Sequence, residues 1–323
     1  MSNFTTDFPV SLPEVLRAEK IVYQYLIPTQ LTYYKNLSDL LGASVYIKHE
    51  NHQPGGSFKI RGGLNIMHHL SREKVPGVIT FSTGNHGLSI ATSAKIYGVS
   101  ATIVVPRGNN PEKNELIKNT GARLVEAGDN LEEAAEAGAK IQKDENLHYI
   151  HAANEPHLIN GVGTEFTEIA RELPDVDAII IPIGAGSELA AAITVFNAIN
   201  PKVEIYAVQA EASQAAYLSW RNGKIMPSES HTFAGGVATG TAFDLPFGIY
   251  KDRLADFILL SEDEIREAMG MALSYTHNLA EGAGAVSIMA ARKLSHRLKG
   301  KNVVLQMSGA NETMANLKQC INV

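Results

Sequence analysis

One lysine stands between two pairs of glycines in the stretch GGSFKIRGG at residues 55–63. A lysine amine becomes a nucleophile toward a carbonyl when burial or nearby positive charge destabilises its ammonium form, and it can then hold an aldehyde as an imine. Phe58 could lie against a flat ring, and the glycines permit close backbone approach and unusual dihedrals. Lysine is usually exposed, so a solvated loop explains the stretch equally well. Lys59 is therefore a candidate nucleophile that the rest of the chain must support.

A second stretch has the form of a phosphate-binding turn. The sequence AIIIPIGAGSELAAA at 178–192 runs from a predicted buried strand through a glycine turn at 184–187 into a predicted helix. Free N–H groups and the positive end of the helix then point at one place, which predicts an anion site. The rival interpretation is a dinucleotide fingerprint, but Leu189 occupies the position that requires a small residue. Glu188 is unexpected here, because its carboxylate would repel a phosphate unless it points away.

Two further turns carry polar groups where ligands could bind. FSTGNHG at 81–87 has hydroxyl, amide and backbone donors at a predicted helix start, which suits a carboxylate. Simple N-capping would account for its hydroxyls but not for the asparagine and histidine that follow them. MSGAN at 307–311 follows the last predicted strand and presents Ser308 at its C-terminal end. Ligands of open α/β sheets bind at such strand ends.

The elements that must position these turns alternate in type from residue 78 onward. Short β-branched runs and amphipathic segments alternate, which predicts βαβ units. The first group has strands at 78–82, 101–105, 122–125 and 148–151 and helices at 86–97, 112–119 and 130–144. The second has helices at 161–172, 187–198, 213–222 and 284–297 and strands at 178–183, 203–209, 257–260 and 303–307. We therefore predict an α/β fold with two open, twisted, mainly parallel sheets flanked by helices.

Other features of the chain refine this picture. Ser261 begins an S-x-x-E capping box that predicts the start of a helix. The glycine- and threonine-rich segment 231–248 is too long for a simple connection, so we expect it to line a site. A chain of 323 residues has room for two lobes. We expect a large domain formed by residues 1–70 and 155–323 and a small domain formed by residues 71–154.

Composition excludes several classes of protein. The formal charge of −6 and the pI near 6.0 provide no broad basic field, which argues against nucleic-acid binding. The single cysteine, Cys320, cannot form an internal disulfide, and the N-terminal sequence lacks a basic segment followed by an apolar run. The longest apolar stretches fall short of the roughly 20 residues that a membrane helix needs. These features predict a cytoplasmic protein that does not enter a membrane.

Taken together, the four motifs describe a site for pyridoxal phosphate bound to an amino acid. They would supply a lysine for an aldehyde, a turn for a phosphate, a turn for a carboxylate and a hydroxyl at a strand end. GGSFKIRGG, STGNHG, GAGSELA and SGAN resemble, in order and rough spacing, the motifs of the fold-type II pyridoxal-phosphate enzymes, which are tryptophan synthase β-like in fold. The resemblance covers nearly the whole chain and is greatest to threonine and serine dehydratases and serine racemases.

The resemblance assigns a role to each motif residue. Lys59 would hold the cofactor as an imine and remove the substrate's Cα proton, and Phe58 would pack beside the cofactor. Asn85 would bind the 3-oxygen of the ring, and Ser308 would bind its nitrogen. The phosphate would be held by backbone N–H groups of Gly184, Ala185, Gly186, Ser187 and Glu188. The substrate carboxylate would be surrounded by Ser82, Thr83, Gly84 and His86.

The expected reaction follows from the group at the ring nitrogen. A neutral hydroxyl such as that of Ser308 does not keep this nitrogen protonated as an aspartate would, so the ring is a weaker electron sink. Such a site favours loss of a β substituent over transamination. We therefore expect dehydration of a β-hydroxy amino acid, L-threonine or L-serine, to a 2-keto acid and ammonia.

Alternatives remain open within and outside this family. One alternative is a racemase. A racemase needs a second acid/base opposite the lysine, which is a serine in racemases of the family, whereas this chain has Thr83 at that position. Others are dehydration of 3-hydroxyaspartate or phenylserine, an NAD-dependent oxidoreductase, and a ligand-binding protein without catalysis. Many relatives bind a divalent cation, and Glu211 matches their first acid, but Tyr217 stands at the second, so we predict no metal site. Glu281 matches a family acid near the mouth of the site, and a homodimer is expected by analogy.

Overall fold

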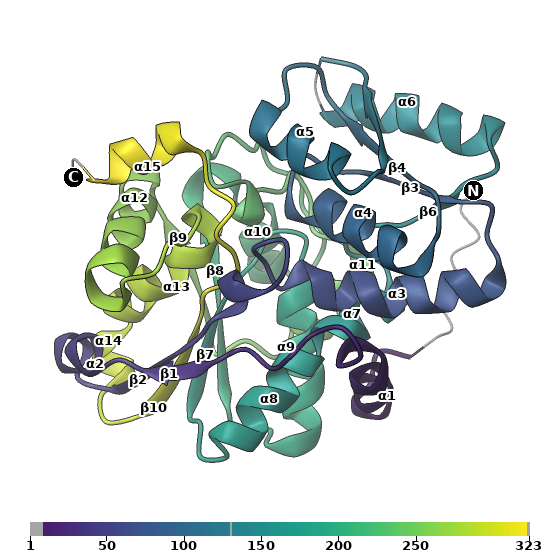
Figure 1. Ribbon diagram of the computed structural model, residues 1–323. Helices are drawn as coiled ribbons and strands as arrows, with labels where there is room; N and C mark the ends of the chain where they lie inside the picture. Colours follow the sequence, from purple (N-terminus) through teal and green to yellow (C-terminus); the bar gives the residue numbers. More distant parts are fainter. Residues whose placement is uncertain (1–8, 130, 322–323) are drawn as a thin grey trace.

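Two mainly parallel sheets with helices on both faces make up the protein (Figure 1). The computed structural model describes residues 9–129 and 131–321. The larger sheet has six strands in the order β1-β2-β10-β7-β8-β9, and the smaller has four in the order β5-β4-β3-β6. Only the β1–β2 pair is antiparallel among the described pairs. The predicted fold class is confirmed.

The larger sheet is built from segments far apart in the sequence. Its strands are β1 (Leu31–Tyr33), β2 (Ser44–Lys48), β7 (Ala178–Pro182), β8 (Glu204–Ala210), β9 (Asp256–Leu260) and β10 (Asn302–Gln306). Its helices are α1 (Leu12–Val22), α2 (Lys35–Leu41), α7 (Pro156–Val162), α8 (Thr164–Glu172), α9 (Ser187–Ile199), α10 (Ala215–Asn222), α11 (Asp244–Tyr250), α12 (Glu262–Met271), α13 (Gly282–Lys293), α14 (Ser295–Leu298) and α15 (Met314–Ile321). Short helical turns lie at Glu50–His52, Glu211–Ser213, Gly235–Val237 and Ala272–Thr276, the last a π-helix.

The smaller sheet comes from one continuous part of the chain. Its strands are β3 (Val78–Phe81), β4 (Ala101–Val105), β5 (Arg123–Glu126) and β6 (His148–Tyr149). Helices α4 (Asn85–Tyr97), α5 (Pro111–Lys118) and α6 (Leu131–Asp144) connect them. The long helix α3 (Lys59–Glu73) packs against α4 of this group and against α7 of the larger one, so it joins the two halves of the molecule.

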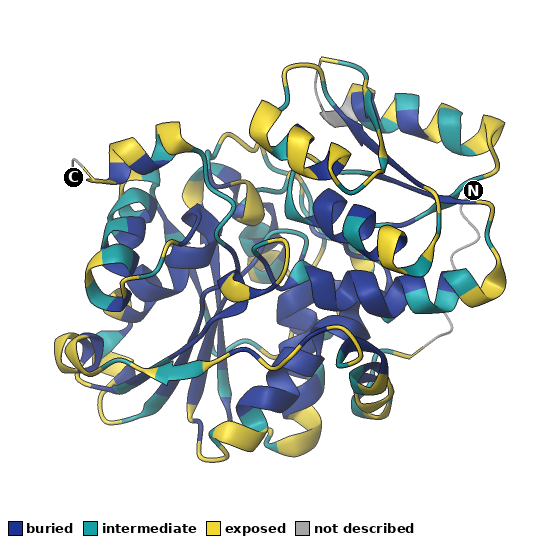
Figure 2. Ribbon diagram, viewed as in Figure 1, coloured by how far each residue is buried: buried dark blue, intermediate teal, exposed yellow. Residues whose placement is uncertain are grey.

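Alternate side chains of the central strands feed two cores, as period-two geometry requires. Ala178 and Ile180 of β7 belong to the cluster beneath α12 and α13. Ile179 and Ile181 belong to the opposite cluster, beneath α7, α8 and α9. Figure 2 shows that the central strands and the helix faces against them are buried, whereas many helix ends and connections are exposed. Burial on both faces explains why these strands are continuous apolar runs.

Several predicted elements differ from those observed. The helix predicted at 161–172 is the end of one helix, α7, and the whole of a second, α8, which are separated only by Gly163, a residue that keeps helical dihedrals. The helix predicted at 284–297 is likewise split at Leu294 into α13 and α14. The strand predicted at 148–151 pairs only at its first two residues. Residue 130, the predicted start of a helix, lies outside the described residues.

Other predictions hold or stay open. The capping box at Ser261 is confirmed, since Ser261 Oγ accepts from the Glu264 N–H and the Glu264 carboxylate accepts from the Ser261 N–H. The segment 231–248 contains a short helical turn and the start of α11. The domain boundaries near residues 70 and 155 stay a prediction, and residues 1–8 and 322–323 of the proposed large domain lie outside the described residues. Helix α3 crosses the first boundary.

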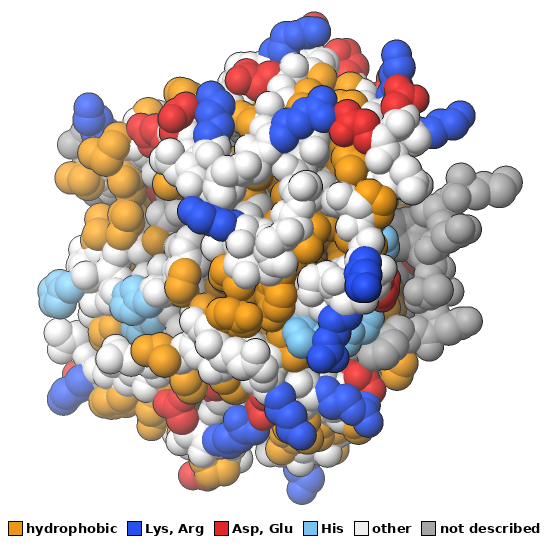
Figure 3. All heavy atoms as spheres, turned by 45° about the vertical axis from the view of Figure 1, so that its right-hand side comes forward, with side chains coloured by type: hydrophobic (Ala, Val, Ile, Leu, Met, Phe, Trp, Pro, Cys, Tyr) orange, Lys and Arg blue, Asp and Glu red, His pale blue; other side chains and the backbone are white. Residues whose placement is uncertain are grey.

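The surface has no single dominant charge on the face that Figure 3 presents. Basic and acidic side chains are interspersed along its upper and lower edges, and apolar side chains lie between them. Within residues 9–129 and 131–321, no helix combines the length and the apolar character needed to cross a bilayer.

Candidate active site

Three of the four motifs meet at one edge of the larger sheet. Strand β10 runs parallel to both β2 and β7, so the turns that follow these three strands lie at the same edge. The chain after β2 leads through a helical turn to Lys59, the glycine turn at 184–187 follows β7, and Ser308 follows β10. The parallel register therefore brings together residues that lie up to 249 positions apart in the chain.

Direct contacts tie these turns to one another. The Phe58 N–H donates to the Ser308 carbonyl oxygen at 3.1 Å. Ser57 and Gly309 form an isolated antiparallel bridge. The Lys59 ammonium donates to Ser187 Oγ at 2.9 Å, which connects the lysine to the head of α9. The lysine, the predicted phosphate turn and the predicted ring-nitrogen residue thus belong to one cluster.

Lys59 is the first residue of α3 and is suited to act as an amine. Burial lowers the pKa of its ammonium group from 10.5 to about 8, despite opposing effects of Glu188, Glu165 and Glu281. Its Nζ lies 4.4 Å from the centroid of the Phe58 ring, and Phe58 is itself buried. A depressed pKa enlarges the fraction of neutral, nucleophilic amine near neutral pH.

The two glycine pairs around Lys59 serve different purposes. Gly55 and Gly56 have φ values of +80° and +70°, a conformation that favours glycine and turns the chain toward the lysine. Gly62 and Gly63 are inside α3, where a Cβ would collide with Leu158 of α7 and with Ser89 of α4, respectively. Ser89 Oγ also donates to the Lys59 carbonyl oxygen at 2.6 Å. The second pair therefore allows close helix packing, a purpose that the sequence alone did not reveal.

The glycine turn has the geometry of an anion cradle. Gly186 precedes α9 with φ of +95°, and a Cβ on Gly184 would collide with the Gly236 carbonyl oxygen. Among the described residues, no acceptor from the protein satisfies the backbone N–H groups of residues 184–189. These donors and the positive end of a 13-residue helix converge on one place, as phosphate binding requires. This fits the predicted site for the phosphate group of pyridoxal phosphate.

The side chain of Glu188 is directed into the protein. It is buried, its Oε1 has no hydrogen-bond partner among the described residues, and burial raises the pKa of the carboxyl well above its usual range. A buried carboxyl with a raised pKa has less tendency to ionise and therefore to repel an anion held by the backbone. The objection raised by its position in the sequence is thereby weakened.

Asn85 is held in place by two neighbours. Its Nδ2 donates to Glu281 Oε1 at 2.6 Å, and its Oδ1 accepts from Asn311 Nδ2 at 2.7 Å. Glu281 is buried at the start of α13, burial raises the pKa of its carboxyl, and its N–H donates to the Gly309 carbonyl oxygen. Asn85 still has one amide hydrogen to donate, so it remains available for the predicted ring contact.

The predicted carboxylate turn offers mainly backbone groups. Thr83 is exposed after the end of β3, and Ser82 and Gly84 are partly buried beside it. His86 is buried, with Nε2 3.1 Å from Thr80 Oγ1, and burial lowers the pKa of the imidazole to about 3. Its ring is neutral, with Nε2 beside Thr80 and Nδ1 buried without a hydrogen-bond partner among the described residues. No described acceptor satisfies the N–H groups of residues 83 and 85–87.

The two positions considered for a cation lie apart from any cluster of acids. Glu211 is exposed, whereas Tyr217 packs against Trp220 and Phe257. Within the described part of the chain, no group of three or more histidine, cysteine, aspartate or glutamate side chains could hold a metal ion.

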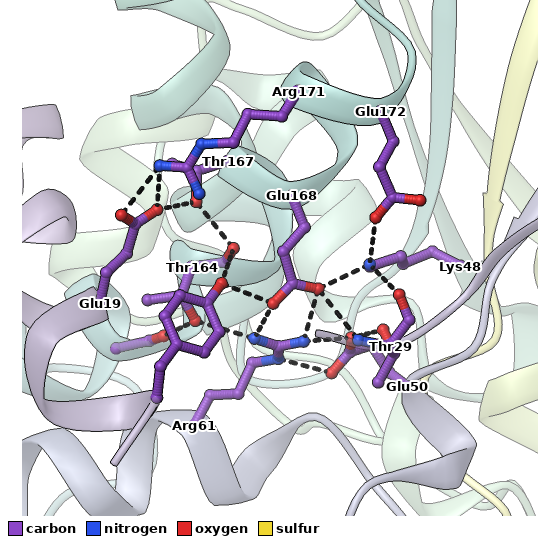
Figure 4. Close-up of polar contacts among 12 residues, drawn as sticks. Glu19, Thr29, Lys48, Glu50, Arg61, Thr164, Thr167, Glu168, Arg171 and Glu172 are labelled. Carbon is purple, nitrogen blue, oxygen red and sulfur yellow. Dashed lines mark hydrogen bonds and ion pairs between the residues drawn. The ribbon is translucent and has the colours of Figure 1, made fainter. Parts of the chain in front are cut away.

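Next to the site lies a fully buried ionic cluster that sequence reasoning missed (Figure 4). The Arg61 guanidinium donates two hydrogen bonds to Glu50, both at 2.8 Å, and two to Glu168, at 2.7 and 2.9 Å. The Lys48 ammonium lies 2.6 Å from Glu168 and donates to the Thr29 carbonyl oxygen at 2.7 Å. Two carboxylates thus face two cations. Arg61 lies only two residues after Lys59, so this cluster fixes the first turn of α3.

Glu165 on α8 was missed as well. It is fully buried, and neither of its carboxyl oxygens has a hydrogen-bond partner among the described residues. The signal in the sequence is its spacing, because Glu165 precedes Ile169 by one helical turn and therefore shares a face with a core residue.

Comparisons with known proteins identify the family of the chain. Residues 22–309 match the family described as "Pyridoxal-phosphate dependent enzyme". The chain is 35% identical over 316 residues to L-threonine ammonia-lyase of Thermotoga maritima, covering 97% of this chain and 78% of that protein. It is 30% identical to the catabolic L-threonine dehydratase of Escherichia coli K12, covering 98% of both. The structure of maize serine racemase matches with a TM-score of 0.91 at 27% identity, again covering 98% of both chains. The chain belongs to the family of pyridoxal-phosphate-dependent enzymes.

Proposed function

We propose that this protein is a pyridoxal-phosphate-dependent ammonia-lyase that converts a β-hydroxy amino acid, L-threonine or L-serine, to a 2-keto acid and ammonia. The observation that carries the proposal is the Lys59 side chain, whose Nζ donates a hydrogen bond to Ser187, the last residue of the glycine turn and the first of α9. The relatives from Thermotoga maritima and Escherichia coli are named for this reaction on L-threonine. These two names mention only L-threonine, so activity on L-serine is a separate part of the proposal.

The donor groups of the site fit the cofactor. Lys59 would hold it through its aldehyde, the N–H groups of the glycine turn would hold its phosphate, and Phe58 would pack beside it. Asn85 and Ser308 would bind the 3-oxygen and the ring nitrogen. When bound, pyridoxal phosphate withdraws electrons from the Cα of an attached amino acid and so makes the Cα–H bond more acidic.

Lys59 would then act as the general base at the substrate's Cα. Its amine, with a pKa of about 8, can accept the Cα proton near neutral pH. The unsatisfied N–H groups of residues 83 and 85–87 would hold the substrate carboxylate and thereby fix which bond at Cα faces the lysine. The β-hydroxyl takes up one proton and leaves as water, which gives an enamine; this tautomerises to an imine, and addition of one water gives the 2-keto acid and ammonia.

Ser308 supports elimination over transamination. It is buried at the end of β10, and its hydroxyl carries no formal charge. A neutral partner does not keep the ring nitrogen protonated, so carbanionic species are stabilised less and lose the β substituent quickly. The residues therefore agree with a lyase.

A substrate panel tests the proposal. Cofactor-loaded protein is incubated with L-threonine, L-serine, 3-hydroxyaspartate and phenylserine, and keto acid and ammonia are measured. We expect stoichiometric keto acid and ammonia from L-threonine or L-serine. Borohydride reduction should fix the cofactor to Lys59, as located by peptide mass spectrometry, and the Lys118→Ala variant should behave like the unmodified protein. Absence of keto acid from every hydroxy acid, or cofactor fixed to another lysine, contradicts the proposal.

Racemisation is a second candidate, favoured by the likeness to maize serine racemase. The Thr83 hydroxyl could transfer a proton, but its methyl group crowds the space. We therefore expect inversion to be slower than elimination. Chiral analysis of the same incubations measures D-serine against keto acid, and faster inversion reverses this ranking.

The molecular setting is also proposed by analogy. We propose that the enzyme works in the cytoplasm as a homodimer, since its only cysteine is buried and unpaired and such assemblies are common in these families. Light scattering of the purified protein tests the dimer. A requirement for a divalent cation stays open, and activity after dialysis against a chelator decides it.

A further inference from the structure

Asn311 ends the MSGAN turn, and the proposed reaction gives it no task. Its Nδ2 donates to the Gly55 carbonyl oxygen at 2.7 Å and to Asn85 Oδ1 at 2.7 Å. Gly55 belongs to the turn before Lys59, and Asn85 is the first residue of α4. One side-chain amide therefore connects three segments of the site that lie far apart in the sequence.

The direction of the Asn85 amide follows from a backbone group. A carbonyl oxygen can only accept a hydrogen bond, so the atom of Asn311 beside Gly55 must be its nitrogen. Both hydrogens of that nitrogen are then used, and the Asn85 atom that accepts the second one must be the oxygen. The Asn85 nitrogen is thereby left to face Glu281, whose Oε1 accepts from it at 2.6 Å.

Glu281 alone would not fix this direction. Burial raises the pKa of its carboxyl, and a protonated carboxyl can donate to an amide oxygen as well as accept from an amide nitrogen. The backbone carbonyl of Gly55 can only accept. The amide of Asn85 is therefore oriented from the side of Asn311.

The glycine pair before Lys59 makes room for Asn311. An ideal Cβ on Gly56 would lie 2.7 Å from Asn311 Oδ1, a distance at which one of the two must move. The Ala310 N–H donates to the Gly56 carbonyl oxygen at 2.9 Å, which holds the two turns together. Gly56 therefore permits the contact of Asn311 as well as the left-handed turn.

The second amide hydrogen of Asn85 is placed beside the end of β10. An ideal Cβ on Gly309 would lie 3.2 Å from Asn85 Nδ2. Gly309 directly follows Ser308, the residue proposed for the ring nitrogen, so the Asn85 nitrogen lies close to the place proposed for the ring. Glu281 accepts one hydrogen of this nitrogen, and the other can meet a further acceptor.

We infer that Asn311 is a positioning residue, which orients the Asn85 amide so that its nitrogen, and not its oxygen, meets the 3-oxygen of the cofactor. The inference deepens the proposed function and rests on it. An N–H group at this point stabilises the ionised 3-oxygen, whereas an amide oxygen would repel it. Asn311 acts only through Asn85.

The absorption of the cofactor bound to Lys59 tests this inference, because the form with an ionised 3-oxygen absorbs at longer wavelength than the neutral form. Asn311→Leu keeps the approximate shape of the side chain but removes both donor hydrogens. It should raise the pKa of the 3-oxygen by about 1, measured from the ratio of the two bands against pH. The matched control Asn316→Leu removes a hydrogen bond of 2.7 Å to Glu312 Oε1 and should leave that pKa unchanged.

A double-mutant cycle tests whether Asn311 acts through Asn85. Asn85→Leu removes the contact with the 3-oxygen itself, so adding Asn311→Leu in that background should change the band ratio no further. An unchanged ratio in Asn311→Leu alone, or the same change in both backgrounds, overturns the inference.

A measurement on the cofactor-free chain separates this inference from the proposed function. Exchange of the Asn85 side-chain amide hydrogens with solvent is followed by NMR. The hydrogen donated to Glu281 should exchange more slowly than the other, and Asn311→Leu should speed its exchange because the amide can then rotate, whereas Asn316→Leu should not. Equal protection of that hydrogen in Asn311→Leu and in the unmodified chain overturns the inference, whether or not ammonia-lyase activity is found. Absence of keto acid with the change in exchange present contradicts only the proposed function.

Discussion

Two cations on the first turn of α3 are treated in opposite ways by their surroundings. The Arg61 guanidinium makes four hydrogen bonds to two carboxylates, and none of these side chains is more than slightly exposed. Lys59, two residues earlier, has one hydrogen bond to a hydroxyl, and burial raises the pKa of its acidic neighbours Glu165 and Glu188. Burial alone lowers the pKa of a cation, whereas paired carboxylates restore it.

The pKa values of the two groups follow from this difference. Burial by itself would lower the pKa of Arg61, but its partners Glu50 and Glu168 raise that pKa well above the ordinary value of arginine. Arg61 therefore stays charged. Burial lowers the pKa of Lys59 to about 8. The fold thus uses one cation to fix a helix and leaves the next one reactive, which is the arrangement expected where structure supports chemistry.

The largest effect should come from removal of the reactive cation. Lys59→Ala deletes both the group that would hold the cofactor and the general base, and the base alone contributes about 10²–10⁴-fold. We expect turnover of L-threonine to fall by at least that factor, while the fold is kept. Keto acid formation measures turnover, and circular dichroism measures whether the fold is kept. Turnover within tenfold of the unmodified enzyme contradicts the assignment.

Removal of the structural cation should damage stability more than any change at Lys59. Arg61→Met leaves Glu50 and Glu168 buried with only Lys48 to oppose them, and breaking such a pair costs about 3–5 kcal/mol. Urea unfolding followed by fluorescence measures this loss. The control Arg107→Met removes a pair that is exposed on both sides and should cost less than about 1 kcal/mol. Similar losses in the two variants contradict a structural role for the cluster.

Loss of the lysine charge should instead stabilise the chain, in a pH-dependent way. The pKa of Lys59 is about 8 in the folded chain against 10.5 for a free lysine. Between these values the unfolded chain binds more protons, so stability of the unmodified protein rises with pH across this window. Lys59→Met should be the more stable protein below pH 8, and its advantage should shrink as pH approaches 10.5. Urea midpoints of the cofactor-free proteins at several pH values measure this. A stability difference between the two proteins that does not change with pH contradicts the depressed pKa of Lys59.

The comparison also explains which parts of the site were predictable. The βαβ alternation and the four motifs depend on neighbouring residues, so the strands from residue 78 onward and the turns at their edges follow from local patterns. The strands β1 and β2, which complete the larger sheet, were not predicted. The meeting of Lys59, Ser187 and Ser308 follows from parallel strand order. The roles of individual residues at these turns remain predictions.

What could not be predicted depends on packing between distant segments. Arg61 and Glu168 are 107 residues apart, and no local pattern marks them as partners. The sequence GGSFKIRGG was equally compatible with a solvated loop and with a reactive lysine, and it did not show that Gly62 and Gly63 lie in a helix, where α7 and α4 approach closely. The inward direction of Glu188 likewise depends on what surrounds α9. Local patterns locate the reactive turns, and tertiary packing decides the charge of the groups on them.

The smallest expected effect defines the outer limit of the structural cluster. Glu172 of α8 lies 3.9 Å from Lys48, but its side chain is 44% exposed (Figure 4). Water already screens that interaction, so Glu172→Gln should change the free energy of unfolding by less than about 0.5 kcal/mol. Denaturant unfolding of Glu172→Gln, run in parallel with Arg61→Met, measures this change. A loss close to that of Arg61→Met would mean that the cluster is stabilised by its total charge rather than by the desolvated hydrogen bonds of its centre.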